Sequence, residues 1–94
     1  MTRNEIIEEI LGIMDEMSDE AENGVEPDMR LLELNDRYSI AVEADFTVDH
    51  VDSWKIYLKE DGEYRDNISY YETQDDVPIL KQDIGYLLDL AGIQ

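Results

Sequence analysis

The strongest constraint on the fold is the spacing of apolar residues near the N-terminus, which follows the helical period. Between residues 2 and 23 the apolar side chains fall within an arc of roughly 160° when successive residues are placed 100° apart, as on an amphipathic helix. Thr2 and Glu5 have the spacing of a capping box, with Thr2 as the N-cap. Asn23-Gly24 supplies the helix stop. The chain is therefore predicted to begin with a helix that has one core face.

After the first helix, apolar residues recur at every second position, which is typical of β-strands. MRLLEL and RYSIAVEADF are predicted to be two strands joined by a tight turn at Asn35-Asp36. In that hairpin Leu31 faces Ile40, and two leucines fall on the opposite face of the sheet, namely Leu32 and Leu34. The segment TVDHVDS that follows is predicted to be a loop.

A third strand places Trp54, Ile56 and Leu58 on one face, and EYRDNISYY returns as a fourth strand. A two-residue loop at Asp61-Gly62 would spoil the apolar face of this hairpin. A three-residue loop, Glu60 to Gly62, is preferred because register follows the buried face. With this loop, two cross-strand pairs lie on the apolar face: Leu58 opposite Tyr64, and Trp54 opposite Ile68.

The C-terminal segment has the signals of a second helix. Asp75 or Asp76 is its expected N-cap, Pro78 lies in its first turn, where a missing N–H costs little, and Gly92 ends it. The order of elements is thus α-β-β-β-β-α. We expect residues 1–94 to form a single acidic α+β domain, a four-stranded antiparallel sheet with N- and C-terminal helices packed on one face.

Charge limits the partners that such a domain can bind. The chain has 25 acidic and 7 basic residues, for a net charge of -18. Direct binding to nucleic acid or to an anionic membrane surface requires a basic face, which seven scattered cations cannot build. No segment approaches the roughly 20 apolar residues of a membrane span, and the N-terminus lacks the basic start of a secretory signal. A cytoplasmic location is therefore expected.

The sequence carries no signature of an enzyme, a cofactor site or a metal site. There is no cysteine, no glycine-rich phosphate loop and no HxH or HExxH spacing. The single histidine, His50, lies among acids in VDHVD. We interpret it as a loop histidine, in preference to a general base oriented by a carboxylate or a metal ligand beside Glu43, Asp45, Asp49 or Asp52. Asp83 falls inside the apolar arc of the last helix, where we favour a structural partner, Arg37, Arg65 or Lys81, over an interface.

The first helix carries an unusual outward face. Its eight carboxylates have no basic residue among them after Arg3; they are Glu5, Glu8, Glu9, Asp15, Glu16, Asp19, Glu20 and Glu22. Like charges four residues apart each cost a few tenths of a kcal/mol, and acids in the last turn oppose the helix dipole. A twenty-residue helix is about 30 Å long, and one DNA strand carries about nine phosphates over that length. We take these eight residues as candidate partner-binding residues.

Two of the six tyrosines complete the candidate contact surface. Tyr57 and Tyr71 alternate away from the apolar face, and tyrosine is a common contact residue at protein interfaces. Together with the acidic helix they favour a small inhibitor that mimics the charge of DNA or RNA and blocks a basic nucleic-acid-binding protein, such as a nuclease or its complex.

Phage-encoded antagonists of restriction and CRISPR nucleases have this general composition, and such a protein would act in the cytoplasm of the host cell. Two alternatives remain open. The chain could be an immunity protein for a cationic nuclease toxin, or its acidity could be a halophilic adaptation to a salty solvent. A homodimer is also open, through the broad apolar arc of the last helix or through Leu32 and Leu34.

Overall fold

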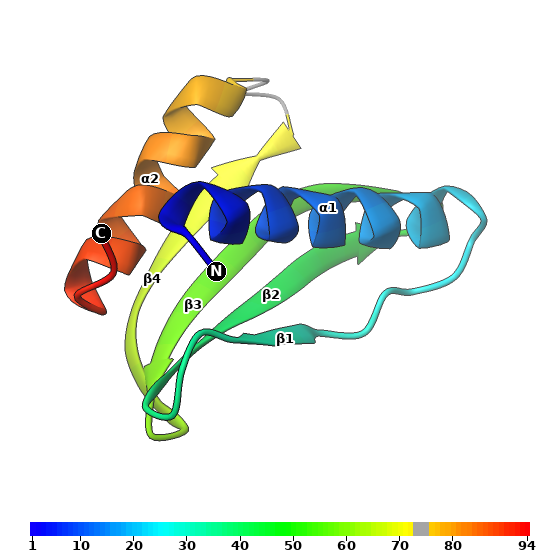
Figure 1. Ribbon diagram of the computed structural model, residues 1–94. Coiled ribbons are helices and arrows are strands. Elements are labelled where there is room, and N and C mark those ends of the chain that lie inside the picture. The colour runs from blue at the N-terminus through cyan, green and yellow to red at the C-terminus, as the bar shows by residue number, and fades with distance from the viewer. Residues whose placement is uncertain (73–75) are drawn as a thin grey trace.

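The structure is a computed structural model, and it describes residues 1–72 and 76–94. The elements in chain order are α1 (Arg3–Glu22), β1 (Arg30–Glu33), β2 (Tyr38–Thr47), β3 (His50–Glu60), β4 (Glu63–Tyr71) and α2 (Val77–Leu90). The four strands form one antiparallel sheet in the order β1-β2-β3-β4 (Figure 1). The predicted α+β fold is confirmed. No helix among the described residues is both long and apolar enough to cross a membrane.

Both helices begin with the predicted caps. Thr2 Oγ1 accepts from the Glu5 backbone N–H at 3.2 Å, and Glu5 Oε1 accepts from the Thr2 backbone N–H at 3.1 Å, which completes the capping box. Asp76 caps α2 by accepting from the Ile79 backbone N–H at 3.1 Å. The other candidate cap, Asp75, lies outside the described residues. These caps satisfy backbone N–H groups that the helices themselves leave without partners.

The core lies between the helices and one face of the sheet (Figure 1). Alternate residues of β2 and β3 point into it, and both helices bury side chains against the same cluster, so both helices cover the same face. Side chains with no exposed surface mark its centre; they include Ile10, Met17, Ile40, Val42, Ile56, Leu58, Ile84, Leu87 and Leu88. The opposite face of the sheet carries polar and aromatic side chains together with Leu31 and Ala41.

Arg3 fastens the two helices to each other. Its Nη1 donates to Asp89 Oδ1 at 2.7 Å and to the Ile93 carbonyl at 2.9 Å, and its Nη2 donates to the Gly85 carbonyl at 2.9 Å. A Cβ at Gly85 would lie only 2.7 Å from Nη2, so glycine leaves the space that the guanidinium occupies. The start of α1 is thereby held against the end of α2.

The register of the first hairpin differs from the prediction by one residue. Leu32 pairs with Ile40 and Leu31 with Ala41. Asn35 lengthens the turn, because its Oδ1 accepts from the backbone N–H groups of Arg37 and Tyr38 at 2.9 and 2.8 Å. A shift of one residue exchanges the faces of a strand. Leu32 and Leu34 therefore pack against the core and are half-buried, whereas Leu31 is 60% exposed.

The second hairpin has a shorter turn than predicted. Asp61 and Gly62 alone connect β3 to β4, both with positive φ (53° and 82°), as a type I′ turn requires. The predicted three-residue loop was wrong. The apolar face was nevertheless correct, because a bulge between Leu58 and Lys59 shifts the register. Past this bulge the pairs are Leu58–Asp66, Ile56–Ile68 and Trp54–Tyr70, and Tyr64 pairs with Lys59 and is exposed.

The segment TVDHVDS is mostly strand, where a loop was expected. Thr47 ends β2 and His50 begins β3, so only Val48 and Asp49 form the turn. A register shift after Asp45 accommodates an extra residue of β3. This part of the hairpin is largely solvent-exposed, so its residues are mostly polar. The sequence of these strand ends therefore resembles that of a loop.

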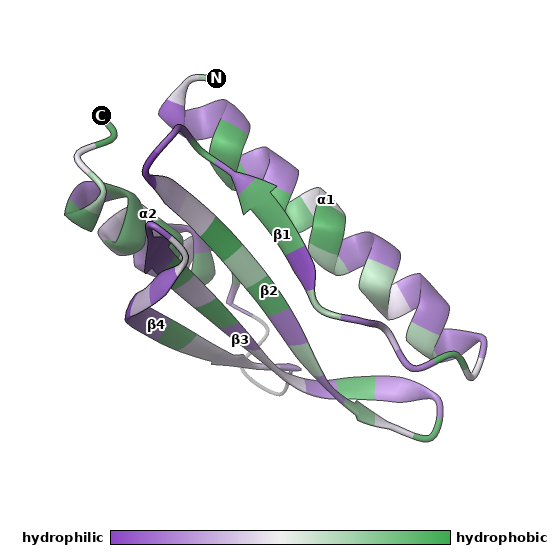
Figure 2. Ribbon diagram, turned by 90° about the horizontal axis from the view of Figure 1, so that it is seen from below, coloured by the Kyte–Doolittle hydropathy of each residue, from purple (hydrophilic) through white to green (hydrophobic). Residues whose placement is uncertain are grey.

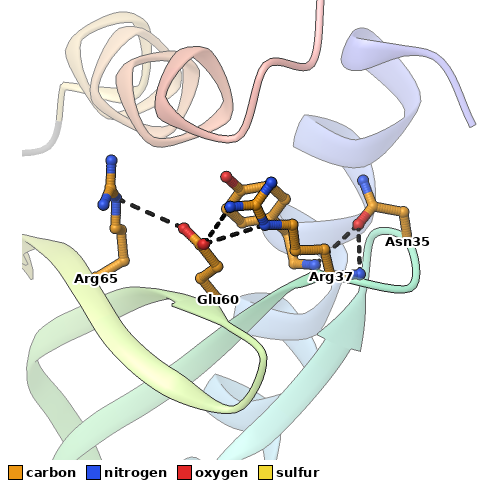
Figure 3. A network of polar contacts seen from close by, with 5 residues as sticks. Asn35, Arg37, Glu60 and Arg65 are labelled. Carbon is orange, nitrogen blue, oxygen red and sulfur yellow. Dashed lines mark hydrogen bonds and ion pairs between the residues drawn. The ribbon is translucent and has the colours of Figure 1, made fainter.

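The turns at the other end of the sheet are tied together by an ion pair (Figure 3). Arg37 Nε donates to Glu60 Oε2 at 3.0 Å, and the Asp61 backbone N–H donates to the Arg37 carbonyl at 2.7 Å. Arg65 Nε lies 3.9 Å from the second oxygen of Glu60. The guanidinium of Arg37 lowers the pKa of the Glu60 carboxyl, and Glu60 in turn raises the pKa of Arg37. Two of the seven basic residues, Arg37 and Arg65, thus pair with Glu60 near these turns.

Candidate functional site

The outward face of α1 is a continuous acidic surface. Seven of the eight predicted carboxylates are exposed and the eighth is half-buried. The helix buries its opposite side in the core, which directs the acidic side to solvent. In Figure 2 hydrophilic residues recur along the whole length of α1. The exposed residues are Glu5, Glu8, Glu9, Asp15, Glu16, Asp19 and Glu22.

Three of the eight carboxylates also have structural contacts. Glu5 completes the capping box, and the backbone N–H of Thr2 lowers the pKa of its carboxyl. Glu20, the half-buried one, accepts from Arg30 Nη2 at 2.7 Å and joins α1 to the start of β1. Glu8 lies 3.2 Å from Lys81 Nζ on α2. Glu20 is thus committed to an internal ion pair, whereas Glu8 remains on the open surface.

The basic side chains do not neutralise this face. Arg3 pairs with Asp89, Arg30 with Glu20, and both Arg37 and Arg65 with Glu60. Within residues 1–72 and 76–94, Lys81 is the only cation in an ion pair with an exposed carboxylate of α1. Glu5 contributes to the helix cap. The other five exposed acids of α1 have no cationic partner among the described residues: Glu9, Asp15, Glu16, Asp19 and Glu22.

The two predicted contact tyrosines lie on the opposite side of the molecule. Ile56 and Leu58 point toward α1 and the core, so Tyr57 between them points to the open face of the sheet. Tyr71 lies on that open face as well and is 56% exposed. Both rings line a hollow of about 320 Å³ that also contains Glu43 and Lys55. Burial, followed by the nearby Glu43, raises the pKa of Tyr57. The acids and the tyrosines therefore cannot form one flat contact surface.

A groove runs beside the acidic face, and the sequence offered no signal for it. It has a volume of about 380 Å³ and lies between α1 and the first turn of α2, above the inner face of the sheet. Leu11 and Asp15 line it from α1, and Val77 lines it from α2. Trp54 lies at its base and donates from Nε1 to Glu72 Oε1 at 2.6 Å. Its walls come from segments far apart in the chain, so only the tertiary structure assembles it.

His50 lies at the exposed tip of the β2–β3 hairpin. Its Nδ1 lies 3.0 Å from Asp49 Oδ1 and its Nε2 lies 2.8 Å from Asp52 Oδ1. Both nitrogens can donate to a carboxylate only in the protonated ring, and accordingly Asp49, followed by Asp52, raises the pKa of His50. Thr47 also donates to Asp52, and this bond is the main cause of that carboxyl's lowered pKa. Across the described part of the chain, no three His, Asp or Glu side chains converge as a metal site requires.

A pH titration tests the role of His50. Because its pKa is raised above the ordinary value of about 6.5, its contribution to stability is complete below pH 6.5 and is lost as pH rises through the raised pKa. The melting temperature of the native protein should therefore exceed that of His50→Gln at pH 6, and the difference should vanish at alkaline pH. A ring pKa at or below 6.5, measured by NMR, would contradict this assignment.

Asp83 does not have the partner that the sequence suggested. It is half-buried on α2, but Arg37 and Arg65 pair with Glu60, and Lys81 pairs with Glu8.

The acidic face of α1 remains the strongest feature of the surface, a rigid row of anionic groups suited to attracting a cationic partner. No protein-family model, curated protein or solved structure matches the chain.

Proposed function

We propose that the protein is a small acidic inhibitor whose α1 face occupies the nucleic-acid-binding surface of a basic protein. The observation that carries this proposal is the row of exposed carboxylates on α1 that lack cationic partners among the described residues. On a typical solvent-exposed helix, basic residues stand four positions after acidic ones, because such ion pairs stabilise the helix. The absence of such residues in α1 after Arg3 costs stability and concentrates negative charge on one face.

The dimensions of α1 support this role. Its 20 residues span about 30 Å, and the seven exposed carboxylates along it approach the number of phosphates, about nine, on one DNA strand of that length. The helix is held rigidly by its capping box and by the contacts of Arg3 with α2. A partner's basic groove would meet this charge pattern without a large cost for ordering the inhibitor.

The net charge of -18 sets the expected kinetics. A strong field of one sign steers an oppositely charged partner toward encounter, so association is fast and weakens as salt is added. The partner class that fits is a nuclease, or the complex around it, whose nucleic-acid site carries clustered Arg and Lys. Restriction and CRISPR nucleases are examples, and the inhibitor would meet them in the cytoplasm.

A retention experiment tests the proposed function. The immobilised protein is exposed to host extract at low and at physiological salt, and the retained proteins are identified. We expect a basic nucleic-acid-binding protein that duplex DNA or structured RNA displaces. Retained proteins that nucleic acid cannot displace, or a chain that is unfolded without molar salt, would contradict the proposal. If the partner is a toxin encoded beside this chain, the same chemistry describes an immunity protein.

A further inference from the structure

The groove between α1 and α2 combines an apolar interior with an acidic rim. Leu11 and Val77 contribute accessible apolar surface, and Val77 is 43% exposed. Met14 and Leu80 lie deeper and are buried. Two exposed carboxylates of α1 border the same space, Glu8 and Asp15.

A third carboxylate enters the groove from the end of β4. Glu72 is held there by the indole N–H of Trp54, which donates to its Oε1 at 2.6 Å. Of these three carboxylates, Glu8 lies 3.2 Å from Lys81 Nζ, and Asp15 has no cationic partner among the described residues. The groove therefore joins an apolar interior to a net negative rim, on the side of α1 that carries the exposed acids.

We infer that this groove seats an arginine side chain of the basic partner, an assignment that rests on the proposed function of α1. Arginine has an aliphatic stem that lies along apolar surface while its charged head remains at the rim. Its planar guanidinium has five donors and can serve two carboxylates at once. The groove would supply the localised contact, and the remaining acids of α1 the long-range attraction.

Lysine matches the groove less well. Its ammonium is a compact, strongly hydrated point charge, which cannot bridge separated carboxylates in a fixed plane. The structure itself shows how a lysine pairs at this rim, since among the described residues Lys81 forms an ion pair with Glu8 only. The groove is therefore expected to select arginine over lysine, whereas a diffuse acidic surface would select neither.

Trp54 provides a built-in reporter, because it is the only tryptophan of the chain and lies at the base of the groove. The probes are a nona-arginine and a nona-lysine peptide, titrated at physiological salt. We expect the arginine peptide to shift the Trp54 emission and its single indole N–H resonance, and to bind at least about threefold more tightly than the lysine peptide. A Trp54 signal that does not respond to bound arginine peptide would overturn the inference.

Matched variants separate groove binding from general attraction. Asp15→Asn removes a charge from the groove, whereas Glu16→Gln removes one from the neighbouring position, outside the groove lining. Asp15→Asn should weaken arginine-peptide binding by about tenfold, the lower end of the range expected for loss of one charge-assisted contact. Glu16→Gln should weaken it less than about twofold. Equal losses in the two variants would reject the groove as a specific site.

The two proposals fail in different ways. If nucleic acid displaces the retained partner but Asp15→Asn and Glu16→Gln behave alike, the α1 face competes with nucleic acid and the arginine groove is wrong. If the arginine peptide shifts Trp54 selectively but no nucleic-acid-binding protein is retained, the groove binds arginine and the proposed function of α1 is wrong.

Discussion

Reversing three carboxylates of α1 together, Glu8→Lys, Asp15→Lys and Asp19→Lys, is expected to abolish binding to the basic partner and leave the chain folded. All three side chains are exposed, so their replacement removes no core contact. Each reversal turns an attraction into a repulsion within the same face, which penalises both association rate and complex lifetime. We expect the dissociation constant at physiological salt to rise about 100-fold or more, which corresponds to roughly 3 kcal/mol. Circular dichroism checks that the fold is retained.

A second triple variant is the control for net charge. Glu33→Lys, Asp45→Lys and Glu63→Lys make the same change in total charge at exposed positions on the sheet and its turns. Because long-range steering depends on the total field, this variant should slow association by only a few-fold and should lose that effect as salt rises. Equal losses in both triple variants would show that total charge, and not the α1 face, determines binding.

Replacing Leu32 by aspartate is expected to destabilise the protein strongly, whereas the same replacement of the adjacent Leu31 should have little effect. Leu32 pairs with Ile40 and packs against the core, and Leu31 is 60% exposed on the opposite face. A charge directed toward the core loses apolar burial and is desolvated. We expect Leu32→Asp to cost about 2–3 kcal/mol and Leu31→Asp less than about 0.5 kcal/mol, measured by urea unfolding.

The pair Leu31 and Leu32 distinguishes two registers of the first hairpin. With a two-residue turn at Asn35-Asp36, Leu31 would face Ile40 and the inner face. In the structure the side chain of Asn35 closes a longer turn, and Leu32 takes that place. If Leu31→Asp were the more destabilising change, the shorter turn would be the correct one.

The helices and their caps were predictable because their signals are local. The capping box of Thr2 and Glu5, the apolar stripe of α1 and the cap at Asp76 each depend on residues within a few positions of one another. The registers of two hairpins were not predictable in the same way. They depend on the two hydrogen bonds that the Asn35 side chain accepts and on a bulge beside Leu58, and each of these features shifts the register by one residue.

The candidate site, too, was predictable only where its residues are close together in the sequence. Helical periodicity placed the eight acids of α1 on one outward face, and the structure adds that Glu20 is committed to Arg30. Strand alternation placed Tyr57 and Tyr71 outside the core, but it gave no information on which side of the molecule they lie. Because α1 covers the inner face of the sheet, the tyrosines lie away from the acids.

By itself the sequence determined the net charge, the two amphipathic helices and the acidic outward face of α1, since each follows from composition or from contacts within one helical turn. The tertiary structure alone decided which cations are spent on internal ion pairs, that the tyrosines lie on the face opposite α1, and that Leu11, Asp15, Trp54, Glu72 and Val77 meet in one groove. These features join segments far apart in the chain. Their positions depend on strand register and on how the helices pack across the sheet, and local sequence patterns do not specify either.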